Sequence, residues 1–241
     1  MNPSTSNTTI SLSIRSICPA VLPLFLCLIP PAGEIIYGNP REFTPLRATK
    51  FFDRQEGAKS LAERLKKTVA LVGMMGSGKT AVGTALAKRL GVPFLDSDAA
   101  IVQAANMSIA EIFERDGEAF FRARESEVLS RLLVGQVGIL STGGGAYLSA
   151  ANRELIHTKG VALWLKADTD LLWNRVRHKT TRPLLRTADP RATLEELVAK
   201  REPSYALAEL MAQARPEYSI AEMVEEVVKV LATREDVLSR D

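Results

Sequence analysis

A complete phosphate-loop pattern constrains the fold of this chain more than any other feature. Residues 73–80 read Gly-Met-Met-Gly-Ser-Gly-Lys-Thr, which has the form G-x-x-x-x-G-K-[ST]. The apolar residues 69–72 before it predict a buried strand, and residues 80–90 after it predict an amphipathic helix. Glycines let backbone amides turn toward phosphate oxygens, and the helix adds its positive N-terminal end. The sequence therefore predicts a nucleoside triphosphate site, with Lys79 on the phosphates and Thr80 on Mg²⁺.

The composition is that of an ordinary globular protein with one sizeable domain. The chain has 241 residues, of which 24% are charged, and a net charge of +3. Because the basic residues form no dense tract, a nucleic-acid partner is not expected. Cys18 and Cys27 are the only cysteines, so neither a disulfide framework nor a cysteine metal site is expected beyond them. This cysteine usage suits a reducing compartment, and we predict a cytoplasmic protein.

The first sixty residues differ in composition from the rest. Residues 1–16 are rich in Ser, Thr and Asn, no acid precedes Glu34, and four prolines interrupt the apolar residues 17–32. That run is too short and too rich in proline for a membrane span, and it lacks the basic start of a secretory signal. We predict a disordered extension over residues 1–60, or an upstream start codon that is seldom used, and a folded domain over 61–235. An organelle transit peptide is the alternative.

Strand and helix patterns alternate through the folded part. Near-continuous apolar strands are predicted at 69–72, 93–95, 137–141 and 161–165. Helices are predicted at 61–67, 80–90, 118–133, 171–177, 194–199 and 223–231, and a capping box at residues 108–111 opens a further helix that ends at Gly117. This order indicates an α/β three-layer sandwich, in which a parallel sheet of about five strands is flanked by helices.

Polar residues follow the predicted strands, and the carboxyl ends of parallel strands meet at one edge of a sheet. Asp96 and Asp98 follow the second strand, and in extended backbone their side chains would point the same way. One carboxylate could support Mg²⁺, while the other could accept a hydrogen bond from a substrate hydroxyl. A helix N-cap beside a solvated acid is the structural alternative.

Four further features are candidates for a site, and two of them, the triple glycine and the basic segment, follow strands at the same edge. Arg122 and Glu125 can pair on one helix, which would fix a guanidinium for a carboxylate, although a surface pair is the commoner outcome. Arg201 is no more persuasive by itself. The three glycines at 143–145 follow a strand and could form an anion-binding nest. Basic residues gather in the segment 178–192, which is typical of a mobile lid over phosphates, with a solvated basic face as the alternative.

Taken in order, these motifs resemble shikimate kinases, over residues 68–231. The motifs are the phosphate loop, Asp-Ser-Asp at 96–98, Gly-Glu-x-x-Phe-Arg-x-x-Glu at 117–125, the triple glycine at 143–145, Arg-Pro-Leu-Leu at 182–185 and Arg-Glu-Pro-x-Tyr at 201–205. The resemblance implies a phosphate-loop kinase fold with a lid, and transfer of phosphate from ATP, with Mg²⁺, to the 3-hydroxyl of shikimate.

The resemblance also implies roles for individual residues. It places ATP on Gly76, Ser77, Gly78, Lys79, Thr80, Ala81, Arg175, Arg182 and Pro183. It places shikimate on Asp98, Arg122, Gly143, Gly144, Gly145 and Arg201. Mg²⁺ would lie at Thr80 and Asp96, and the catalytic residues would be Lys79, Asp98 and Arg182. An arginine that often covers adenine in this family has no clear match here, and Arg215 is a weak candidate.

Two other functions remain open at this point. One is a related kinase that phosphorylates another hydroxy acid, such as gluconate; the triple glycine together with Arg201 favours shikimate. The other is a sensor that keeps the fold without turnover. The absence of Lys79, Asp98 or Arg182 would have favoured a sensor, but all three are present. Nothing in the sequence demands an oligomer, so a monomer is predicted.

Overall fold

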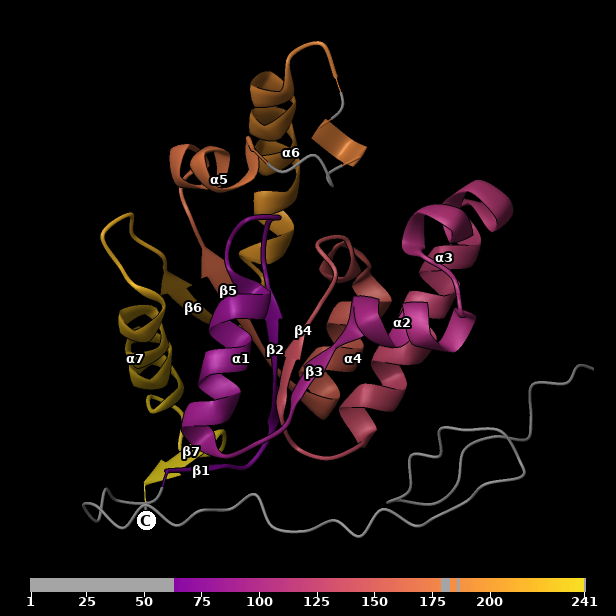
Figure 1. Cartoon of the computed structure of the whole chain (residues 1–241). Helices are drawn as coiled ribbons and strands as arrows, with labels where there is room; N and C mark the ends of the chain where they lie inside the picture. The colour runs from indigo at the N-terminus through magenta and orange to yellow at the C-terminus, as the bar shows by residue number, and fades with distance from the viewer. Residues whose placement is uncertain (1–62, 179–182, 186, 241) are drawn as a thin grey trace, which may run out of the picture. The chain divides into compact units, whose positions relative to one another are not determined.

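Five strands of the domain form a parallel sheet with the strand of the phosphate loop at its centre (Figure 1). The computed structural model describes residues 63–178, 183–185 and 187–240. In sheet order the strands are β3 (Phe94–Asp96), β4 (Ile139–Ser141), β2 (Thr68–Val72), β5 (Gly160–Lys166) and β6 (Leu210–Gln213). Every residue of β2 and β4 is buried, which explains why the sequences of these strands are almost continuously apolar.

Helices connect the strands. They are α1 (Lys79–Leu90), α2 (Ser97–Ala105), α3 (Ile109–Val134), α4 (Ala150–Lys159), α5 (Thr169–Val176), α6 (Pro190–Tyr205) and α7 (Ile220–Leu231), with short 3₁₀ turns η1 (Ala146–Leu148) and η2 (Pro183–Leu185). The predicted capping box of Ser108 and Glu111 is confirmed at the start of α3. The predicted break at Gly117 is also confirmed, because this residue has φ 80° and ψ 174° within α3.

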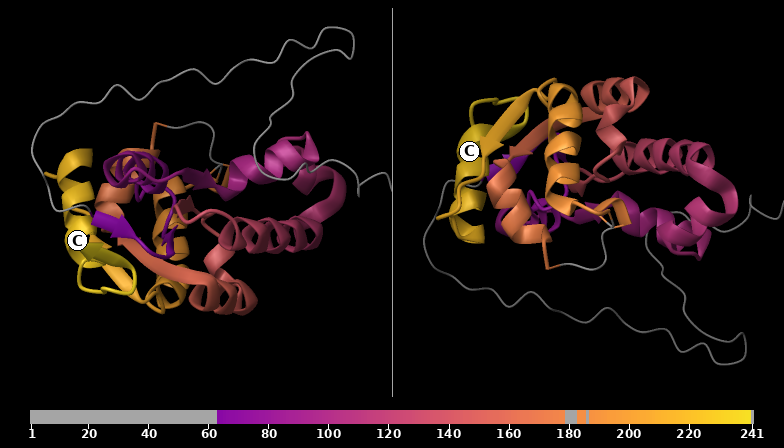
Figure 2. Two further views of the ribbon diagram at one scale, coloured as in Figure 1. Left: turned by 90° about the horizontal axis from the view of Figure 1, so that it is seen from below. Right: turned by 90° about the horizontal axis from the view of Figure 1, so that it is seen from above.

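The two faces of β2 pack into different cores, which makes the three layers. Val69 and Leu71 face the core that contains α1 and α7, whereas Ala70 and Val72 face the core that contains α3, α4, α5 and α6. A smaller cluster joins α2 to α3, and Figure 2 shows this helix pair projecting beyond the sheet. The predicted three-layer α/β fold is therefore confirmed.

The ends of the domain differ from the prediction. Residues 61–67 were predicted to be helical, but Glu63–Leu65 form strand β1, which pairs antiparallel with β7 (Leu238–Arg240). The prediction is wrong because the partner strand lies at the other end of the domain, so no local pattern signals it. Leu65 and Leu238 are paired in register, and both are buried.

Other elements were predicted incompletely. Helix α6 runs past both ends of the predicted 194–199 segment, and it contains Pro203 in its last turn. Strand β6 and helices α2 and α4 were not located from the sequence. The predicted extension over residues 1–60 lies outside the described residues. No helix in the described part of the chain is long and apolar enough to cross a membrane.

Candidate active site

A cavity of about 470 Å³ opens at the carboxyl ends of the strands, over the phosphate loop. Its lining comes from the loop and the start of α1, from Asp96 and Asp98, from the end of β4, and from the start of α7. Gly76 and Gly78 have φ of 83° and 103°, values that a side chain would strain. The Ser77 hydroxyl is buried without a hydrogen-bond partner among the described residues. A loop of this shape at a helix N-terminus fits a phosphate group.

Two cations are fixed against the phosphate loop. The Lys79 ammonium donates to the carbonyl oxygens of Gly73 and Met74, at 2.8 and 3.0 Å. The Arg175 guanidinium reaches across from α5 and donates to the carbonyl oxygens of Gly76 and Ser77, both at 3.3 Å. Burial lowers the pKa of Arg175 from its ordinary value. Lys79 and Arg175, which were both predicted to bind the nucleotide, therefore lie at the loop, although they are far apart in the sequence.

Asp96 and Asp98 do not share the extended backbone that the sequence analysis assumed. Strand β3 ends at Asp96, whose carboxylate caps α2 by accepting hydrogen bonds from the backbone amides of Asp98 and Ala99. Asp98 is therefore helical and lies in the first turn of α2. The assumption that extended backbone continues through Asp98 was wrong, because Asp96 at the end of the strand is also a favourable N-cap for a helix. Both carboxylates nevertheless line the cavity.

The triple glycine brings the predicted acceptor residues together. A Cβ atom added to Gly143 would lie 2.6 Å from Asp98 Oδ1 and 3.0 Å from Glu125 Oε1. A Cβ atom on Gly145 would lie 2.6 Å from Arg122 Nη1. The absence of side chains at these positions thus lets charged groups from α2 and α3 approach the backbone after β4.

Gly144 faces Arg201, the third side chain predicted to bind the acceptor. A Cβ atom at this position would meet Arg201 Nη1, from α6, at 3.8 Å. Each glycine of the triplet therefore lies beside a different charged group: Asp98 and Glu125, then Arg201, then Arg122. All the predicted acceptor residues lie at one place.

The Arg122 guanidinium is held by two carboxylates of its own helix. It donates to Glu125 at 2.8 Å and to Glu118 at 3.1 Å. The Glu125 side chain is buried. Burial raises the pKa of Glu125, an effect that the neighbouring Arg122 guanidinium partly offsets. The predicted pair of Arg122 and Glu125 is thus not a surface pair.

One wall of the cavity was not predicted from the sequence, apart from Arg215, which was a weak candidate for covering adenine. Arg215, Tyr218, Ser219, Ile220 and Met223 also line it, and the Arg215 guanidinium lies 5.5 Å from the centre of the Tyr218 ring. The capping box of Ser219 and Glu222 was a readable signal for the start of α7. The wall was missed because β6, which delivers this segment to the sheet edge, was not located.

Two predicted residues of the lid remain predictions. Arg182 lies outside the described residues, and so does most of the segment that precedes η2. Pro183 begins η2.

Comparison with known proteins decides the family. The family model described as shikimate kinase matches residues 75–232. The shikimate kinase of Ruegeria pomeroyi is 66% identical over 177 residues, which cover 73% of this chain and 91% of that protein. The shikimate kinase of Cereibacter sphaeroides is 58% identical over 189 residues, covering 78% of this chain and 94% of that protein. This chain belongs to the shikimate kinase family.

A solved structure places the fold in the same family. The shikimate kinase from Acinetobacter baumannii in complex with shikimate superposes with a TM-score of 0.64 and 35% identity, covering 69% of this chain and 93% of that one. As a shikimate kinase, the chain catalyses ATP-dependent phosphorylation of shikimate, a step of aromatic biosynthesis. The family assignment favours this activity over the gluconate kinase and sensor alternatives.

Proposed function

We propose that this shikimate kinase transfers the γ-phosphoryl group of ATP in line to the shikimate 3-hydroxyl, between the phosphate loop and the triple glycine. The observation that carries the proposal is the position of Asp98. Its carboxylate lines the cavity over the phosphate loop and also lies against Gly143. One side chain therefore stands where a phosphoryl donor and an acceptor hydroxyl would meet.

The donor side is built for a triphosphate. The loop amides and the N-terminus of α1 hold the phosphates of ATP at Gly76, Ser77, Gly78, Thr80 and Ala81. Lys79 moves from the loop carbonyls to the transferred group, where its charge stabilises the equatorial oxygens. Arg182 and Pro183 approach from the lid, and Arg175 lies against the adenosine.

The acceptor side is built for a carboxylated ring. Arg122 and Arg201 bind the carboxylate, because a guanidinium offers two parallel N–H groups to two oxygens. The glycines Gly143, Gly144 and Gly145 leave room for the ring and offer backbone amides. Asp98 accepts a hydrogen bond from the reacting hydroxyl and takes its proton as the bond to phosphorus forms.

The donor set near the phosphate loop fits Mg²⁺. Thr80 and Asp96 line one cavity, and no cluster of three or more His, Cys, Asp or Glu side chains suited to a metal occurs within the described ranges. Mg²⁺ commonly uses one or two protein ligands, with phosphate oxygens and water completing its shell. We propose that Thr80 and Asp96 hold it, directly or through water, and it would neutralise phosphate charge. We also propose a cytoplasmic location, in keeping with the bacterial relatives, and a monomer, because nothing in the sequence demands an oligomer.

A coupled assay of ADP release tests the proposal. With ATP and Mg²⁺, shikimate should give ADP release that depends on acceptor concentration, and gluconate should give none above background. The Lys79→Met enzyme should lose the shikimate-dependent signal. ADP release that is independent of shikimate, or equal with gluconate, would contradict the proposed acceptor.

A further inference from the structure

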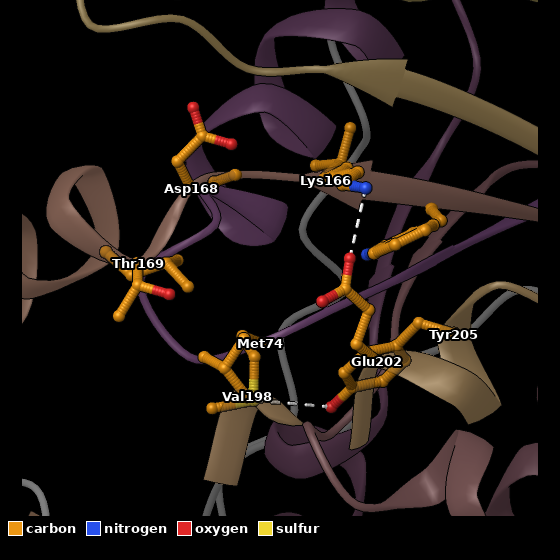
Figure 3. A pocket seen from close by; sticks show the side chains of 11 residues that line it. Met74, Lys166, Asp168, Thr169, Val198, Glu202 and Tyr205 are labelled. Carbon is orange, nitrogen blue, oxygen red and sulfur yellow. Dashed lines mark hydrogen bonds and ion pairs between the residues drawn. The ribbon is translucent and has the colours of Figure 1, made fainter. Parts of the chain in front are cut away.

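The hydroxyl of Tyr205 connects the two loops of the active site. Tyr205 ends helix α6, its side chain is buried, and its Oη donates to the Gly144 carbonyl oxygen at 2.6 Å. The same Oη lies 3.8 Å from the sulfur of Met74 (Figure 3). Gly144 belongs to the triple glycine, and Met74 belongs to the phosphate loop. One buried hydroxyl therefore contacts both the acceptor loop and the donor loop.

The helix that carries this hydroxyl also carries an acceptor residue. Arg201 lies four residues before Tyr205 on α6, which is one turn of helix. The Arg201 guanidinium faces the same Gly144 at which the Tyr205 hydrogen bond ends. Arg201 and the hydroxyl of Tyr205 are thus one helical turn apart and meet the same glycine.

Helix α6 packs into the core through Leu194 and the ring of Tyr205, but part of the helix faces a pocket instead. A pocket of about 300 Å³ lies between α6 and the end of β5, and Val198, Glu202 and Tyr205 line it on the side of α6 (Figure 3). Across this pocket, Glu202 pairs with Lys166 at 3.0 Å, but both side chains are more than a third exposed. An exposed pair of this kind contributes little, so the buried hydrogen bond is the stronger connection.

We infer that Tyr205 is a positioning residue for acceptor binding, whose hydrogen bond to Gly144 holds Arg201 and the triple glycine in one arrangement. The inference rests on the proposed function, because it assigns Arg201 and Gly144 to the acceptor. Burial raises the pKa of the Tyr205 hydroxyl, although the nearby Arg201 charge acts in the opposite direction. The hydroxyl therefore stays protonated at neutral pH and remains a donor.

A second tyrosine provides a matched control. Tyr147, in η1, is also buried, and its Oη donates to the carbonyl oxygen of Leu207 at 3.2 Å. Burial raises the pKa of Tyr147 to about 12. Leu207 lies two residues after the last residue of α6, and its carbonyl is not part of the acceptor loop. Tyr205→Phe removes a hydroxyl that α6 carries. Tyr147→Phe removes a hydroxyl that bonds to the backbone just after α6.

Steady-state kinetics of Tyr205→Phe and Tyr147→Phe test the inference. Tyr205→Phe should raise the KM for shikimate about tenfold, the effect of losing one well-made hydrogen bond. The KM for ATP and kcat should stay within about threefold of the unchanged enzyme. Tyr147→Phe should leave the KM for shikimate within about twofold. An unchanged KM in Tyr205→Phe, or an equal rise in Tyr147→Phe, would overturn the inference.

Thermal unfolding with and without shikimate gives a second readout if Tyr205→Phe is less stable. Saturation with shikimate raises Tm according to its affinity, so the shift should be smaller for Tyr205→Phe than for Tyr147→Phe. Equal shifts in both variants would also overturn the inference. The unchanged enzyme separates the two hypotheses, because absence of shikimate-dependent ADP release there contradicts the proposed function rather than the role of Tyr205.

Discussion

Arg122 and Glu125 form an ion pair of 2.8 Å whose two ends differ in exposure. The Arg122 side chain is 37% exposed and belongs to the proposed acceptor site, whereas the Glu125 side chain is 2% exposed and lies within the fold. A buried carboxylate that is hydrogen bonded to a guanidinium fixes the direction of that guanidinium. The pair therefore gives the proposed acceptor site a cation whose orientation is set before a substrate binds.

Replacement of Glu125 by glutamine tests this orientation. Glu125→Gln keeps the shape of the side chain but removes the charge, so Arg122 should lose its fixed geometry. We expect the KM for shikimate to rise about tenfold while the KM for ATP changes by less than about twofold. Initial rates at varied shikimate and ATP concentrations measure both constants.

The same helix offers a control for Glu125→Gln. Arg124 and Glu127 have the same spacing and pair at 2.7 Å, with both side chains about half exposed. Because such a surface pair contributes little, Glu127→Gln should leave the KM for shikimate unchanged. A similar KM effect in the two variants would show that the charge of α3, and not the orientation of Arg122, controls acceptor binding.

Asp98 should affect turnover more than binding. Asp98→Asn keeps the size of the side chain but removes a proton acceptor, so kcat should fall about 100-fold. The KM for ATP should change little, since the phosphate loop and Lys79 are untouched. Asp170→Asn, in an exposed side chain of α5 paired with Arg191, serves as the control. Turnover of Asp98→Asn equal to that of this control would remove Asp98 from the mechanism.

Gly145 should tolerate no side chain, for a reason that is local to the site. The nearest atoms to an added Cβ are the Nη1, Nη2 and Cζ atoms of Arg122, at 2.6, 2.8 and 3.0 Å. These atoms end a flexible side chain, so Gly145→Ala should displace the guanidinium without unfolding the protein. We expect the KM for shikimate to rise about tenfold or more, as measured by initial rates. The Tm should change little.

Another glycine controls for the substitution itself. An added Cβ at Gly135 would meet backbone oxygens only at 3.6 Å, an ordinary contact. Gly135→Ala should therefore leave the KM for shikimate unchanged. If Gly145→Ala also leaves it unchanged, then Arg122 does not bind the acceptor in the position seen here.

The structural features that the sequence predicted correctly depend on short stretches of residues. The phosphate loop is defined by eight consecutive residues and its flanking strand and helix. Likewise, Gly117 and the Ser108 capping box are local signals, since left-handed backbone and helix caps depend on one or two residues. The rule that strand ends in a parallel sheet share an edge put Asp98 and the triple glycine together. Arg122 and Arg201 lie on helices, and the family resemblance, not this rule, assigned them to the same site.

The parts that were not predicted depend on residues far apart in the chain. Strand β6 reads Leu-Met-Ala-Gln, residues that favour helices, so only its pairing with β5 makes it a strand. Strand β1 is likewise formed of Glu-Arg-Leu and exists through pairing with β7. The tie between Tyr205 and Gly144 joins residues separated by 61 positions, and no spacing rule connects them.

The join between β1 and β7 gives a prediction about acid stability. Asp236, just before β7, pairs with Lys67 at 2.7 Å and with Arg234 at 2.6 Å. These cations hold the pKa of Asp236 below its ordinary value of 3.8. A lowered pKa means that the folded protein binds the proton less readily than the unfolded chain. The stabilisation is therefore complete above about pH 4 and is lost as the pH falls through the lower pKa of the folded state.

Asp236→Asn should remove this pH-dependent contribution. The Tm difference between the unchanged protein and Asp236→Asn should be constant near neutral pH and should shrink as the pH is lowered below about 4. Thermal unfolding followed by circular dichroism across this range measures the difference. Removal of one cation in Lys67→Met should move the titration midpoint of the Asp236 carboxyl upward, as followed by NMR. A Tm difference that grows at low pH, or a midpoint unaffected by Lys67→Met, would contradict the assignment of this acid response to Asp236.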